Sequence, residues 1–124
     1  MPESDELSID IKEIRWRQES MDGSMDLLLK ANREAIMADI EDFFGNSKRR
    51  AQVYLAVDGE RSVGEIAQLL NMKMPNVSSD LSKCAEEGLI ERIPDPSKGG
   101  FVWKKKRIDK VLHFSGYLRK KFGL

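Results

Sequence analysis

The chain has 124 residues, which is enough for one small hydrophobic core. Hydrophobic residues make up 40% of it and charged residues 34%, as in ordinary soluble proteins, and no apolar run approaches the roughly 20 residues that cross a bilayer. The formal net charge is zero, but residues 1–47 hold five basic and twelve acidic side chains, whereas residues 48–124 hold sixteen basic and nine acidic ones, so the second part is the one suited to a polyanion.

Residues 1–23 form an acidic N-terminal arm. The arm lacks the basic and apolar segments of a secretory signal, which predicts a cytoplasmic protein that does not engage a membrane. Its apolar residues fit a strand or a loose helix, and its composition also allows disorder, so the structure of the arm stays open. Those residues are Ile9, Ile11, Ile14 and Trp16.

Residues 24–46 are predicted to form one amphipathic helix, with Ser24 as its N-cap and Gly45 at its end. The next helix begins after Ser47 and packs beneath the elements that follow it. A shorter helix is predicted over 63–70, because Ser62 and Glu65 have the spacing of a capping box.

A further helix is predicted from Pro75 to Glu87, because proline suits the first turn of a helix and Gly88 can end it. Its inward stripe consists of Val77, Leu81, Cys84 and Ala85. Its outer face is expected to carry Asn76, Ser79, Asp80, Ser82, Lys83, Glu86 and Glu87. The single cysteine is therefore interpreted as a core residue rather than as a redox sensor.

Two short strands follow, around Leu89–Ile93 and Phe101–Trp103, with a Gly/Pro-rich tip between them. The order of these elements predicts a mainly α fold with a small β wing: a winged helix-turn-helix over 47–107 with extra flanking helices, in one domain. The run Pro75, Asn76, Val77, Ser78, then Leu81, then Glu87 to Ile90 resembles the recognition-helix signature of bacterial and archaeal winged-helix repressors, such as the arsenical-repressor and multiple-antibiotic-resistance-regulator families.

The resemblance implies that helix 75–87 enters the major groove of double-stranded DNA. The base-reading candidates are Asn76, Ser78, Ser79 and Ser82. The phosphate-binding candidates, which include the basic run that leaves the second wing strand, are Lys73, Lys83, Lys98, Lys104, Lys105 and Lys106. The basic cluster 119–121 suits a helix carboxyl end and is interpreted as a solvated face.

The C-terminal residues 108–124 are predicted to form a second flanking amphipathic helix. Its apolar face and that of helix 24–46 need a covering surface, either their own domain or a second copy of the chain. A homodimer is the interpretation favoured here, because it would place two recognition helices about one DNA turn apart. These two helices are also the candidate surfaces for a protein partner.

Catalytic and metal-binding motifs are missing from the sequence. His113, the single histidine, has no nucleophile or acid at a motif spacing, and Gly99-Gly100 lacks the lysine and helix of a phosphate loop. One histidine and one cysteine cannot supply the usual metal ligands. The sequence therefore predicts no enzyme, no cofactor and no metal site.

The predicted function is a sequence-specific DNA-binding transcriptional regulator. The alternative is a protein-protein interaction module on a winged-helix scaffold, which a serine-rich helix with an outward Asp80 would favour. RNA binding ranks lower, because no aromatic platform for base stacking is present. The sequence leaves open the operator, the direction of regulation and any effector. It also leaves open whether the acidic arm masks the DNA-binding surface.

Overall fold

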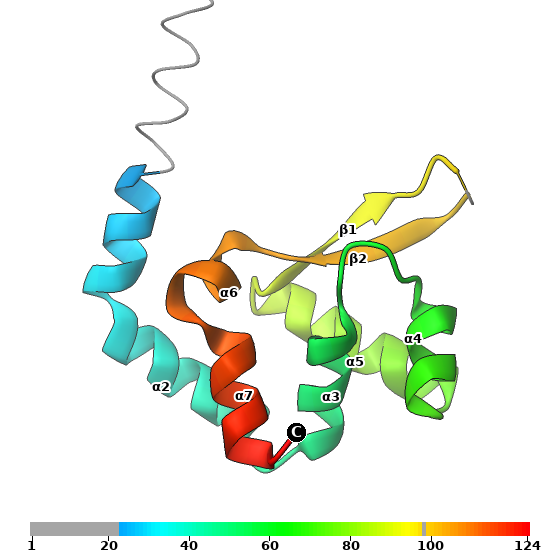
Figure 1. The fold of residues 1–124 in the computed structure, drawn as a ribbon, viewed down its shortest axis with the longest axis horizontal. Helices are drawn as coiled ribbons and strands as arrows, with labels where there is room; N and C mark the ends of the chain where they lie inside the picture. The colour runs from blue at the N-terminus through cyan, green and yellow to red at the C-terminus, as the bar shows by residue number, and fades with distance from the viewer. Residues whose placement is uncertain (1–22, 98) are drawn as a thin grey trace, which may run out of the picture.

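The computed structural model describes residues 23–97 and 99–124, so the predictions for most of the acidic arm and for Lys98 lie outside the described residues. A helical segment over residues 23–31 comes first. It is followed by α2 (Arg33–Phe44), α3 (Lys48–Ala56), α4 (Val63–Leu70), α5 (Met74–Glu86), β1 (Ile90–Pro94), β2 (Phe101–Lys105), α6 (Arg107–Leu112) and α7 (Phe114–Phe122) (Figure 1).

The three central helices begin and end where local signals place them. Ser47 Oγ accepts a hydrogen bond from the amide of Arg50 at the start of α3, and Ser62 and Glu65 form the predicted capping box of α4. Asn71 then takes the left-handed conformation, with φ 53°, that ends α4. The helices α3, α4 and α5 all contact one another, which is the packing a helix-turn-helix needs.

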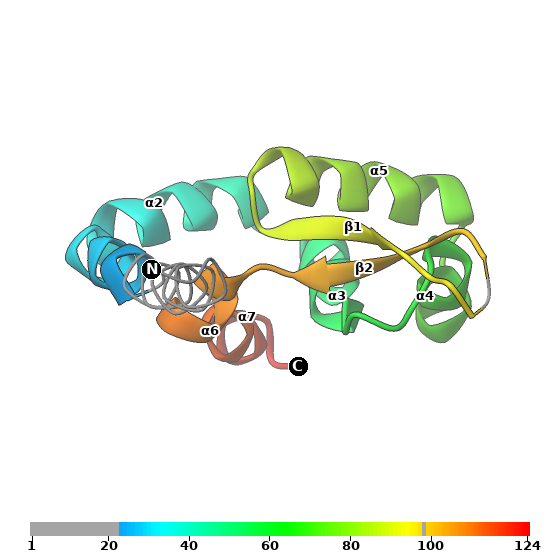
Figure 2. The same ribbon diagram turned by 90° about the horizontal axis from the view of Figure 1, so that it is seen from above.

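The two strands form an antiparallel hairpin that lies beside α5. The register pairs Ile90 with Lys105 and Pro94 with Phe101, so the second strand continues two residues beyond its predicted end at Trp103. Figure 2 shows the hairpin running along α5, with its tip at the same end of the molecule as α4. The predicted wing is therefore present.

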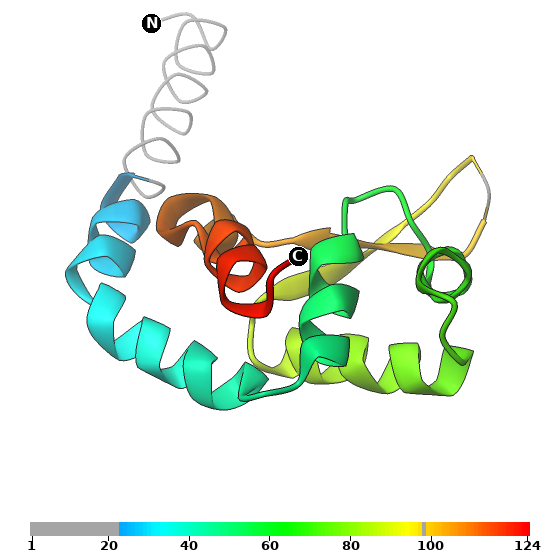
Figure 3. The ribbon, with the colours of Figure 1, turned by 60° about the horizontal axis from the view of Figure 1, so that its bottom comes forward.

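The first flanking helix differs from its prediction. The chain turns at Asn32, whose backbone and side-chain amides both donate to the carbonyl of Leu28, so 24–46 is not one helix. Ser24 lies inside the helical segment instead of capping it. The bend, visible in Figure 3, lets α2 pack on α3 while residues 23–31 point away from it.

The C-terminal helix is also broken. His113 has φ 58° and ψ 43°, and it separates α6 from α7, so the prediction of one helix over 108–124 is wrong. The break places Leu112 and Phe114 in the core from two different helices, while His113 itself is exposed. Burial of two large side chains compensates for a backbone conformation that costs a non-glycine residue about 1–3 kcal/mol.

Both α2 and the α6–α7 pair are covered by their own domain. Phe44, Phe114 and Leu118 belong to the same buried cluster as Tyr54 of α3 and Leu81 of α5. Residues 23–31 are different, because three of their large apolar side chains are exposed: Met25 by 56%, Leu27 by 69% and Leu28 by 64%.

Candidate nucleic-acid interface

The outer face of α5 presents small polar side chains to solvent. Its inward stripe is confirmed: Val77, Leu81 and Cys84 are fully buried, and Ala85 is partly buried against the same core. Four of the exposed residues are the base-reading candidates Asn76, Ser78, Ser79 and Ser82. Their side chains form no hydrogen bond with another described residue, so their hydroxyl and amide groups are free to meet a ligand.

The amino end of α5 is suited to an anion. Lys73 is its exposed N-cap, no side chain caps the helix, and Pro75 lies in the first turn. Pro75 has no amide hydrogen and the amide of Asn76 donates to the carbonyl of Lys73, so the helix dipole and the Lys73 ammonium are what make this end positive. Lys83 is also exposed, near the other end of the helix, so both predicted lysines of α5 are in reach of a ligand that lies along it.

Asp80 corrects a prediction. It was expected on the outer face of α5, but its side chain is fully buried. One carboxylate oxygen lies 3.0 Å from Nε of Arg49, and the other lies 3.4 Å from Nη2 of Arg49 and 3.5 Å from Nε of Arg50. The two guanidinium groups compensate the buried charge, and an inward Asp80 does not repel a phosphate on the outer face.

Sequence reasoning gave Arg49 and Arg50 no individual role. A signal was present: Asp80 lies three residues after Val77 and four before Cys84, which places it on the buried stripe. A carboxylate at such a position requires a cationic partner. That partner is Arg49, which lies 31 residues away in the sequence, and only the fold identifies it.

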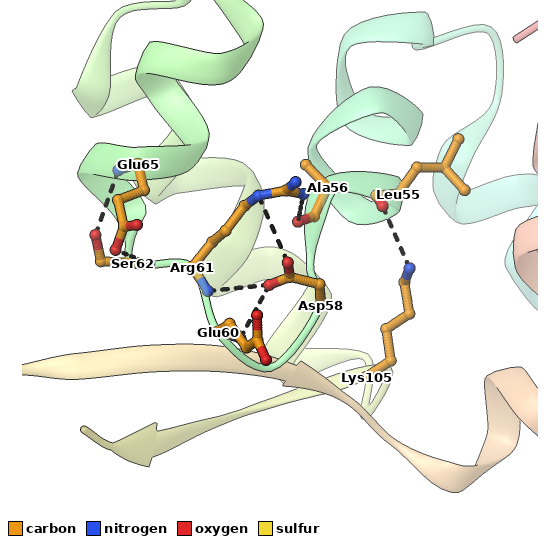
Figure 4. Close-up of polar contacts among 8 residues, drawn as sticks. All are labelled: Leu55, Ala56, Asp58, Glu60, Arg61, Ser62, Glu65 and Lys105. Carbon is orange, nitrogen blue, oxygen red and sulfur yellow. Dashed lines mark hydrogen bonds and ion pairs between the residues drawn. The ribbon is translucent and has the colours of Figure 1, made fainter. Parts of the chain in front are cut away.

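The three lysines at the end of the wing fall into two classes. Lys104 and Lys106 are exposed. Lys105 is half-buried, and its ammonium donates to the carbonyl of Leu55 at 3.3 Å (Figure 4). The same ammonium lies 5.3 Å from the ring centre of Tyr54. Burial lowers the pKa of Lys105. The prediction that Lys105 binds phosphate is therefore revised, because its charged end is used inside the domain.

The loop between α3 and α4 joins the wing to the helices. The amide of Gly59 donates to the carbonyl of Trp103 at 2.8 Å, and the amide of Trp103 donates to the carbonyl of Arg61 at 3.2 Å. Asp58 accepts from the amides of Glu60 and Arg61 (Figure 4). Burial raises the pKa of Asp58, but these hydrogen bonds outweigh that effect and the pKa is lowered overall. The loop thus fixes the wing relative to α4.

The sequence also made predictions about the cysteine, the possible metal ligands and the helix lengths, and the structure describes each of them. Burial raises the pKa of the Cys84 thiol to about 12, as expected for a core cysteine. Among the described residues, no three His, Cys, Asp or Glu side chains are grouped so that they could hold a metal ion. Within residues 23–97 and 99–124, no helix combines the length and the apolar character needed to span a membrane.

Comparison with solved structures identifies the fold. No family model and no curated protein sequence matches this chain. The crystal structure of NolR from Sinorhizobium fredii superposes with a TM-score of 0.53 at 22% identity, over 76% of this chain and 91% of that one. The crystal structure of MarR gives a TM-score of 0.50 at 17% identity, over 77% of each chain.

The chain has a winged helix-turn-helix fold. In this winged helix, α4 and α5 are the two helices of the motif, and α5 holds the position of the recognition helix. The hairpin β1–β2 is the wing, and Lys104, which pairs with Glu91, is exposed on it.

Proposed function

We propose that this protein is a transcriptional regulator that binds double-stranded DNA, with α5 in the major groove and the wing against the backbone. The observation that carries the proposal is the outer face of α5, where exposed hydroxyl and amide groups lie between two exposed lysines. Hydroxyl and amide side chains can hydrogen-bond base edges, and lysines bind phosphates. The likeness to the MarR fold agrees with the sequence resemblance to the multiple-antibiotic-resistance regulators.

Asn76 and Ser79 are proposed to read bases, with Ser78 and Ser82 beside them. Lys73, Lys83, Lys104 and Lys106 are proposed to bind phosphates, because all four are exposed. Lys98 was predicted for the same role at the tip of the wing. Each phosphate contact of this kind adds to the salt dependence of binding.

The protein is further proposed to act as a homodimer. The support is the exposed apolar group on residues 23–31, formed by Met25, Leu27 and Leu28, because water-exposed apolar surface is stabilised when a second surface covers it. Sedimentation of wild type and of a Leu27→Lys, Leu28→Lys double variant tests this. We expect a dimer for the wild type and a monomer for the variant; a monomeric wild type at every concentration would contradict the dimer.

The test of DNA binding is selection from a pool of random duplexes at two salt concentrations, followed by sequencing. We expect enrichment of a palindromic motif and weaker retention at the higher salt. Asn76→Ala should relax the preference at one base step, and Lys104→Gln should weaken binding to all sequences. Retention without enrichment would limit the function to nonspecific binding.

A second candidate function is a protein-protein interaction module that does not bind DNA. The observation in its favour is the same exposed apolar group on residues 23–31, which can receive a partner other than a second copy. The inward position of Asp80 removes one argument for this module, since no carboxylate from that residue opposes DNA. A protein that retains no duplex at low salt would favour the interaction module.

A further inference from the structure

Arg49 joins α3 to the recognition helix through a buried carboxylate. Its Nε and Nη2 groups face the two oxygens of Asp80 at 3.0 and 3.4 Å, a two-point geometry that fixes the plane of the guanidinium. The Arg49 side chain is nevertheless 49% exposed, whereas Asp80 is fully buried. The inner edge of the guanidinium is therefore held, and its outer edge reaches solvent.

The cluster around Asp80 has an excess of positive charge. A second guanidinium, that of Arg50, approaches the same carboxylate at 3.5 Å, donates to the carbonyl of Phe43 at 2.6 Å and lies 4.7 Å from the Phe43 ring centre. Two cations thus share one anion. Arg50 is the more buried of the two and is used inside the domain, which leaves Arg49 as the cation that faces outward.

The location of Asp80 on α5 shows which part of the interface Arg49 borders. Residues three and four apart share a side of a helix. Asp80 is four residues after Asn76 and three before Lys83, so it lies at the border between the buried stripe of α5 and the flank that carries these two exposed residues. Arg49 reaches that flank from α3 and extends the basic surface beyond α5 itself.

We propose that Arg49 is a phosphate-binding residue of the DNA interface, and that Asp80 is a positioning residue that holds its guanidinium ready for the phosphate. The inference rests on the proposed DNA binding. A guanidinium can bind one anion through Nε and Nη2 and still offer its other N–H groups to a phosphate. Because the side chain is already fixed, less conformational freedom is lost when the phosphate binds.

The test is a series of titrations of a duplex with the full-length protein at several salt concentrations. Arg49→Gln removes the charge at that position. We expect binding about tenfold weaker at low salt, the size of one charge-assisted contact, and a slope of log affinity against log salt reduced by about 0.9. Lys120→Gln removes the same charge from the exposed surface of α7 and should leave both quantities unchanged.

Asp80→Asn separates positioning from charge. By charge alone, loss of a carboxylate should strengthen DNA binding; if Asp80 positions Arg49, binding should weaken instead. In the Arg49→Gln background the same substitution should no longer weaken binding, since the group that Asp80 positions is gone and only the effect of its charge remains. Thermal unfolding of each variant identifies those that remain folded.

Arg49→Lys serves as the second variant if Arg49→Gln does not fold. It keeps the charge but lacks the planar fork, so we expect an unchanged salt slope and weaker binding. Wild-type affinity and slope in Arg49→Gln, or wild-type affinity in Arg49→Lys, would overturn the proposal while leaving DNA binding intact. A wild-type protein that shows no salt-dependent duplex binding would overturn the proposed function, and this inference with it.

Discussion

Two exposed surfaces of the molecule have opposite chemistry. The outer face of α5 carries hydroxyl, amide and ammonium groups, while residues 23–31 expose methionine and leucine side chains. The first surface suits a hydrated, charged ligand, and the second suits an apolar surface that excludes water. A single small chain thus exposes a polar face on α5 and an apolar group on residues 23–31.

The largest expected effect is on the free energy of unfolding, and it distinguishes a buried residue of the flanking helices from an exposed one. Phe114→Ala removes a fully buried ring from the core shared by the flanking helices, and should lower the free energy of unfolding by about 3–5 kcal/mol. Leu27→Ala, at a 69% exposed position, should change it by less than about 0.5 kcal/mol. Urea unfolding at a concentration where the chain is monomeric measures both.

If Phe114→Ala proved as mild as Leu27→Ala, the α6–α7 pair would not be part of the core. The contrast between a covered and an uncovered flank would then be wrong.

A smaller effect distinguishes the two neighbouring lysines of β2. Lys104→Gln should reduce the slope of log affinity against log salt by about 0.9, because its exposed ammonium is proposed to meet a phosphate. Lys105→Gln should leave the slope unchanged, because that ammonium is bound to the carbonyl of Leu55. Equal slopes for the two variants would remove the distinction drawn from their burial.

The smallest effect concerns how residues 23–31 are held. Arg107 binds Asp26 through Nε at 2.6 Å and Nη2 at 2.9 Å, and this hydrogen-bonded pair lowers the pKa of Asp26 below its ordinary value of 3.8. A lowered pKa means that the pair stabilises the folded segment above about pH 4, and that this contribution is lost as the pH falls through the folded-state pKa.

An NMR titration of the Asp26 carboxyl measures that pKa directly. We expect it to return toward 3.8 in Arg107→Gln. The same low value in both proteins would show that Arg107 does not anchor the segment.

The parts of the fold that depend on local chemistry could be predicted from the sequence. The capping box of Ser62 and Glu65 acts within a few residues and lies where it was predicted, and the helix ends at Leu70 as predicted, with Asn71 in the left-handed conformation. The buried stripe of α5 follows from helical spacing alone.

The predictions that proved wrong concern features that depend on contacts between residues far apart in the sequence. The breaks at Asn32 and His113 leave the apolar period almost unchanged, so the pattern alone does not reveal them. Asp80 and Lys105 turn inward because partners far along the chain, Arg49 and the carbonyl of Leu55, receive them. The four base-reading candidates, whose exposure needs only the helical pattern, lie where the sequence places them.

The most direct test of the account is an NMR titration of the ¹⁵N-labelled protein with a duplex, mapped residue by residue. We predict that amide shifts concentrate on residues 73–83, at the start and along the outer face of α5, and on residues 104–106 at the end of the wing, and that residues 23–31 stay unchanged. Shifts confined to residues 23–31, or none on α5, would contradict the assignment of the polar face of α5 to DNA.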